Sequence, residues 1–173
     1  MKKLLLIALL GLFMPQQAAA LTLEEGADAP TRGIEDYIKD FVDVPEGAQD
    51  WKTFGKTEVI NVETKDAEGF DWQYYKPGFQ PELKALDGKK IRIKGFMFPL
   101  DETEEQKLFL FGPFPLNCPF QYHVQANLVI EVQAAKPVSF TYDPVVIEGT
   151  LELVPEDREN STFYRLKYAR EAK

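Results

Sequence analysis

The stretch GKKIRIKGF at residues 88–96 has the alternating pattern of a β-strand with a glycine inside it. One face of this strand, extended to residue 98, carries Ile91, Ile93, Gly95 and Met97. The other face carries Arg92, Lys94, Phe96 and Phe98. A glycine within a strand is typical of a bulge or a sharp bend, which a small barrel needs in order to close. The stretch VVIEGTLEL at residues 145–153 also has a central glycine, so the two stretches predict strands of an OB-type barrel.

Further short strands are predicted on both sides of these two, separated by turn residues. They cover residues 57–64, 70–75, 107–111, 128–132, 138–142 and 162–168. Many short strands with one or two helices predict a mainly β protein, a small OB-like β-barrel with an N-terminal helix. Closure would protect the edges of the sheet. The alternative fold is a β-sandwich.

The first twenty residues have the three-part layout of a secretory signal peptide. Lys2 and Lys3 precede an apolar run that ends at Met14, and three alanines at residues 18–20 offer a cleavage site near Ala20. The apolar run is too short to span a bilayer. We therefore expect a soluble protein in the periplasm or secreted, with no membrane insertion after cleavage. A retained N-terminal anchor is the alternative.

The predicted signal peptide is followed by an N-terminal extension at residues 21–50 and the barrel domain at residues 51–173. The extension contains an amphipathic helix, whose apolar face is formed by Ile34, Tyr37, Ile38, Phe41 and Val42. Pro45 and Gly47 are predicted to end this helix.

The composition excludes several classes of function. The chain has 173 residues and a formal net charge of -8, which disfavours binding to nucleic acid and to anionic lipid. With one cysteine and one histidine it contains no zinc-finger spacing, and no P-loop or nucleophile-elbow pattern is present. We therefore predict a non-catalytic binding or accessory protein. An enzyme using carboxylates is the alternative, because catalytic carboxylates leave no motif.

The single cysteine and the single histidine lie five residues apart, at Cys118 and His123. Thiolate and imidazole suit Cu(I) or Zn(II), and Met97 would add a thioether if the fold brings it close. These three residues are the predicted metal ligands. The alternative is a structural loop with a buried cysteine, because two ligands do not make a stable zinc site.

Six phenylalanines crowd residues 96–120. If one set is exposed, it forms a docking surface, so Phe96, Phe98 and Phe120 are the predicted contacts of an adaptor that binds a protein partner. The alternative is that these side chains belong to the core.

Several short motifs between residues 51 and 168 resemble the DUF3299 family of exported bacterial proteins of unknown function. These motifs are FQPEL at residues 79–83, LDGKKI at 86–91, GFMFPLD at 95–101, FLFGP at 109–113, the Cys118 loop and VIEGTL at 146–151. The resemblance implies an OB-like exported domain, sometimes encoded beside ABC-type transport components. It therefore points to a periplasmic or inner-membrane transport protein as the partner.

Overall fold

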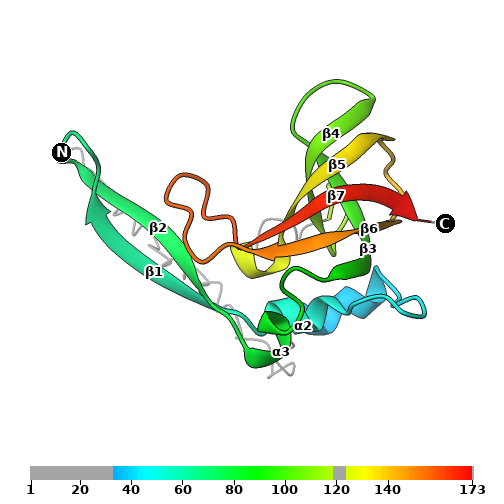
Figure 1. The fold of residues 1–173 in the computed structure, drawn as a ribbon, viewed down its shortest axis with the longest axis horizontal. Coiled ribbons are helices and arrows are strands. Elements are labelled where there is room, and N and C mark those ends of the chain that lie inside the picture. Colours follow the sequence, from blue (N-terminus) through cyan, green and yellow to red (C-terminus); the bar gives the residue numbers. More distant parts are fainter. Residues whose placement is uncertain (1–32, 119–123, 173) are drawn as a thin grey trace, which may run out of the picture. The chain divides into compact units, whose positions relative to one another are not determined.

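The computed structural model describes residues 33–118 and 124–172, as one compact unit (Figure 1). The predicted signal peptide therefore lies outside the described residues. Among the described residues, no helix has the length and the apolar character needed to cross a membrane. The helices are α1 (Ile34–Tyr37), η1 (Ile38–Asp40), α2 (Trp51–Gly55), α3 (Pro81–Lys84) and η3 (Ala126–Leu128). The strands are β1 (Glu58–Lys65), β2 (Asp71–Gly78), β3 (Lys90–Pro99), β4 (Glu105–Gly112), β5 (Ile130–Ser139), β6 (Val145–Leu153) and β7 (Tyr164–Ala172).

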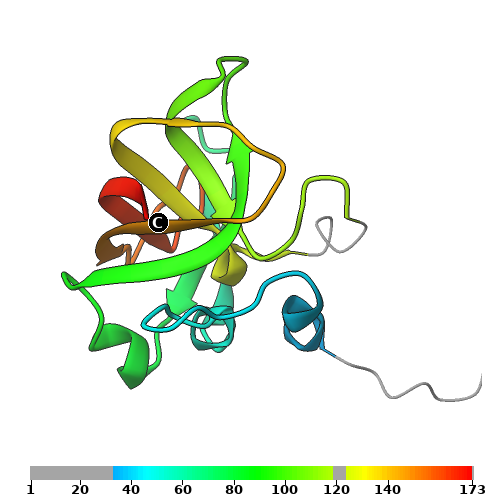
Figure 2. The ribbon, with the colours of Figure 1, turned by 90° about the vertical axis from the view of Figure 1, so that its right-hand side faces the viewer.

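Five strands close into a barrel in the order β3-β4-β5-β7-β6, which confirms the predicted fold class (Figures 1 and 2). The pair β5–β7 is parallel, and the other four pairs are antiparallel. Residues 138–142 do not form the separate strand expected from the sequence, because β5 continues unbroken to Ser139. Every barrel strand thus has two neighbours, and no sheet edge is left open in this part of the molecule.

Gly95 is the point at which β3 changes partner. Residues 90–95 pair with β6, and residues 96–99 pair with β4. A Cβ atom on Gly95 would lie 2.6 Å from the carbonyl oxygen of Gly112 and 2.9 Å from the ring of Phe111. Only glycine allows this approach, so the strand requires a glycine where it passes from β6 to β4.

A short helix, α2, closes one end of the barrel, where it lies beside α3 in both views (Figures 1 and 2). The Asp50 carboxylate caps the helix by accepting the amide N–H of Lys52 at 2.9 Å. Trp51 and Phe54 are buried, and the Trp51 indole N–H donates to the carbonyl of Lys94 at 2.7 Å. The sequence did not predict α2. The predicted N-terminal helix is present as α1 continued by η1, with Ile38 buried.

Strands β1 and β2 form a separate antiparallel hairpin outside the barrel (Figure 1). Three hydrogen bonds attach β2 to the loop between β6 and β7. The Tyr74 hydroxyl donates to Glu156 at 2.6 Å, and the Trp72 indole N–H donates to the carbonyl of Arg158 at 3.0 Å. The amide N–H of Tyr75 donates to the Ser161 hydroxyl at 3.0 Å. The hairpin therefore positions this loop, which borders the candidate site.

Candidate functional site

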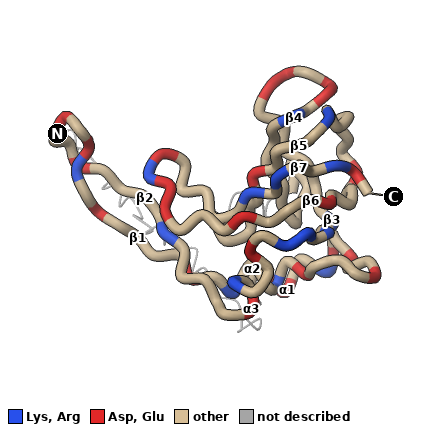
Figure 3. The backbone as a smooth tube through the Cα atoms, viewed as in Figure 1, with Lys and Arg blue, Asp and Glu red and all other residues tan. Residues whose placement is uncertain are grey.

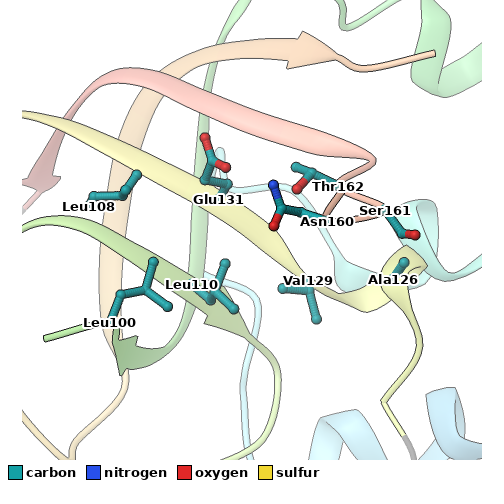
Figure 4. A pocket seen from close by; sticks show the side chains of 9 residues that line it. All are labelled: Leu100, Leu108, Leu110, Ala126, Val129, Glu131, Asn160, Ser161 and Thr162. Atoms are coloured by element: carbon teal, nitrogen blue, oxygen red, sulfur yellow. The ribbon is translucent and has the colours of Figure 1, made fainter. Parts of the chain in front are cut away.

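A pocket of about 480 Å³ lies on the outer face of β4 and β5 (Figure 4). Its floor comes from the two strands and from the segment that contains η3 and leads into β5, and its walls come from the β3–β4 connection and the β6–β7 loop. The lining residues are Leu100, Leu108, Leu110, Ala126, Val129, Glu131, Asn160, Ser161 and Thr162. In β4, Phe109 and Phe111 are fully buried, so alternation places Leu108 and Leu110 on the opposite face. The result is an apolar floor with polar groups on one wall, as in many ligand pockets.

The polar wall is held in place by hydrogen bonds within the β6–β7 loop. The Asp157 carboxylate accepts the amide N–H groups of Glu159 and Asn160 at 3.2 and 3.1 Å. The carbonyl of Asp157 accepts the amide of Ser161, whose backbone has the uncommon φ of 54°. With the bond from Tyr75 described above, these contacts order the wall before any ligand arrives.

Glu131, the one carboxylate among the described lining residues, is neutralised. Glu131 pairs with Arg165 at 3.0 Å and accepts a hydrogen bond from the Gln133 amide at 2.8 Å. Arg165 also lies 3.5 Å from Asp157, which links the strand to the loop. The pocket therefore offers apolar contact and neutral hydrogen-bonding groups rather than net charge.

Two of the three predicted metal ligands, Met97 and Cys118, lie in the described part of the chain. Met97 is buried in the barrel with 1% of its surface exposed, Cys118 is a buried free cysteine, and His123 lies outside the described residues. Among the described residues, no three His, Cys, Asp or Glu side chains gather at one point. Copper or zinc binding stays a prediction, which elemental analysis of the wild type and of Cys118→Ser would test.

The predicted partner contacts lie mainly in the core. Phe96 and Phe98 are each 7% exposed, and Phe120 lies outside the described residues. Beyond Gly95 the strand is buried on both faces, so alternation there does not separate an outer from an inner side. The exposed apolar side chains near this end of the barrel are instead Leu100 at 54% and Leu108 at 45%. Neither leucine was predicted as a surface contact, although leucines alternating with phenylalanines in β4 were a signal for a second apolar face.

The attachment of the hairpin to the loop is expected to weaken in acid. The hydrogen bond from Tyr74, together with the one from Arg158, lowers the pKa of Glu156 from its ordinary value of 4.5 to about 2. A carboxyl whose folded pKa is depressed stabilises the folded contact above its unfolded pKa, and this contribution is lost as the pH falls from about 4.5 towards 2. We expect Trp72, the more exposed of the two tryptophans, to become more accessible to acrylamide quenching over this range.

The control is Glu156→Gln, which removes the titrating group. In this variant we expect Trp72 to be more accessible already at pH 7, with no further step between pH 5 and 2.5. Circular dichroism at each pH separates release of the hairpin from unfolding of the barrel. An identical acid step in wild type and variant would show that Glu156 does not control the contact.

Comparison with known proteins gives a family but no activity. The model of the family "Protein of unknown function (DUF3299)" matches residues 39–171. A DUF3299 family protein from Pseudomonas aeruginosa PAO1, known from a crystal structure, is 27% identical, with a TM-score of 0.41. The match covers 52% of this chain and 65% of that protein's length. No curated protein matches the chain.

Proposed function

This chain belongs to the DUF3299 family, and from that premise we propose that it is an exported, non-catalytic accessory protein that binds a partner protein through the pocket on β4 and β5. One observation carries the proposal. An ordered, walled, apolar pocket occupies the face of a small barrel between two loops, the place where OB-type barrels bind their ligands. The resemblance to a family sometimes encoded beside ABC-type transport components favours a transport protein as the partner.

The chemistry of the lining favours a segment of protein over nucleic acid. OB-type barrels that bind single strands combine a positive groove with aromatic side chains on which bases stack. The nine described lining residues include no aromatic and no basic side chain. Leucine, valine and alanine beside neutral hydroxyl and amide groups match apolar side chains on an extended peptide, with the polar wall available to the peptide backbone.

The exposed leucines supply the driving force. Leu100 and Leu108 are each about half exposed, and both border the pocket. Burying apolar surface contributes roughly 25 cal/mol for each Å² removed from water. Because the wall is ordered in advance by Asp157 and Tyr75, little of that gain would be lost to ordering the site.

Replacing Leu108 by glutamate is expected to weaken peptide binding at least about tenfold, since a charge would be desolvated in the pocket. The probe is a set of peptides selected on the wild type from a random dodecapeptide library displayed on phage, with affinities measured by calorimetry. The matched control is Leu116→Glu, which introduces the same charge at a leucine with 41% exposure that does not line the pocket.

The proposal requires the selected peptides to be rich in apolar residues and to lose affinity with Leu108→Glu but not with Leu116→Glu. Equal binding to both variants would place the peptide elsewhere. If no peptides were selected, or if the selected peptides did not compete with one another for a single site, the pocket would be rejected as a protein-binding surface.

A further inference from the structure

The β6–β7 loop covers only part of an aromatic stripe formed by residues of β2 and the turn before it. Trp72 and Tyr74 share one face of the strand, and Phe70 lies two residues before Trp72. Tyr74 is 4% exposed, because Arg158 and Glu156 lie against it, whereas Trp72 is 43% exposed and Phe70 is 70% exposed. Coverage thus decreases step by step towards the tip of the hairpin.

A hollow of about 330 Å³ lies beside this stripe, between the hairpin tip and the β6–β7 loop. It is lined by Thr64, Lys65, Asp66, Ala67, Trp72, Arg158 and Glu159. We call this hollow together with Phe70 the hairpin notch. It shares no lining residue with the pocket on β4 and β5, so it is a separate surface.

The hairpin notch is surrounded by a surplus of negative charge. Its two cations are already paired, Lys65 with Asp71 at 2.7 Å and Arg158 with Glu156 at 3.1 Å. Within residues 33–118 and 124–172, no lysine or arginine pairs with Glu159 or Asp66. The segments 63–72 and 156–159 together contain seven acidic and two basic residues, and the acidic side of this balance is visible on the hairpin and loop in Figure 3.

The exposed aromatic residue at the tip is held by a defined turn. The Asp66 carboxylate accepts the amide N–H groups of Phe70 at 2.8 Å and Glu68 at 3.1 Å. The amide of Asp66 donates in turn to the carbonyl of Phe70 at 2.9 Å. An aromatic side chain presented on an ordered turn loses little conformational freedom when a partner covers it.

We infer that the hairpin notch docks a basic segment of a partner protein, independently of the pocket on β4 and β5. A lysine or arginine of the partner lies against the Trp72 ring, where the cation interacts with the aromatic face. The carboxylates of Glu159 and Asp66 complement its charge, and an apolar neighbour in the partner covers Phe70. The surplus of negative charge makes an anionic membrane or a nucleic acid the wrong partner for this surface.

The experiment uses a fluorescein-labelled octapeptide of alternating arginine and leucine, with glutamate replacing arginine in a second peptide, and measures binding by fluorescence anisotropy. We expect the arginine peptide to bind, with an affinity that falls as salt is added, and the glutamate peptide not to bind. Trp72→Ala is expected to weaken binding about tenfold. Glu159→Gln is expected to weaken binding about fivefold. Because Glu159 lies on an exposed loop, this change is not expected to affect folding.

Two controls separate a specific site from general attraction. Glu102→Gln removes the same charge from the β3–β4 connection, outside the lining of the hairpin notch, and is expected to leave the affinity within about twofold. Leu108→Glu blocks the other pocket and should leave this binding intact, so the two proposals can fail separately. Equal losses in Glu159→Gln and Glu102→Gln, binding of the glutamate peptide, or no binding of the arginine peptide at millimolar concentration would each overturn the inference.

Discussion

Replacing Phe54 by alanine is expected to lower the free energy of unfolding by about 3–5 kcal/mol. Phe54 is fully buried where α2 closes the end of the barrel. Its ring meets Tyr164 edge-on at 5.1 Å between centroids and Trp51 at 5.8 Å. Removal of the ring leaves a cavity between side chains that come from the helix and from β7.

The residues around the missing Phe54 ring cannot easily move to fill the cavity. We therefore expect a loss of stability near the upper end of the range given above. The Tyr164 hydroxyl donates to the carbonyl of Phe54 at 3.1 Å, and the Trp51 indole is tied to Lys94. Both neighbours are therefore held by hydrogen bonds and cannot turn into the space without leaving a buried polar group unpaired. A rigid surrounding keeps the cavity open, and an open cavity adds to the cost of the lost contacts.

Urea denaturation followed by far-ultraviolet circular dichroism measures the effect. Lys52→Ala is the matched control, because it truncates an exposed side chain on the same helix and should change the free energy of unfolding by less than about 0.5 kcal/mol. A loss below about 1 kcal/mol for Phe54→Ala would mean that α2 does not contribute to the core.

The helix that carries Phe54 was not predictable from apolar periodicity. The segment WKTFG is five residues long, and helical periodicity needs a window about twice that length. A signal was nevertheless present, since Asp50 is a favoured cap and Trp51 and Phe54 are three residues apart. Short plug helices are stabilised by tertiary packing rather than by their own sequence, so local patterns find them only with difficulty.

The barrel strands were predictable because one face of each is buried, which leaves an alternating pattern. The pocket was not, because whether Leu108 is covered depends on a loop fifty residues away in the sequence. Phe96 and Phe98 show the reverse error, because the sequence predicted them to be exposed and the fold buries them. Their alternation placed them on an outer face, but β3 changes its partner at Gly95 and is buried on both faces beyond it.

The second substitution with a large expected effect is at Gly95, where β3 changes its partner. Gly95→Ala is expected to lower the free energy of unfolding by about 2–3 kcal/mol. The added methyl group would lie 2.6 Å from the carbonyl oxygen of Gly112, 2.9 Å from the Phe111 ring and 3.1 Å from the Trp51 ring. The oxygen cannot retreat freely, since Gly112 pairs with Phe96 in the first step of the β3–β4 ladder. The two rings are buried and packed against each other, with centroids 6.1 Å apart.

Gly55→Ala provides the matched control because it makes the same chemical change beside atoms that can move. There the added methyl group would meet the Glu35 side chain at 3.0 Å, and this flexible side chain can turn away. The higher helix propensity of alanine offsets the remaining cost, so we expect a change of less than about 1 kcal/mol. If Gly95→Ala were as stable as Gly55→Ala in urea, β3 would not require a glycine where it leaves β6 for β4. A large loss of stability in Gly95→Ala alone would show that the glycine is required because β3 passes close to the backbone of Gly112. This close contact lies where β3 leaves β6 and begins to pair with β4.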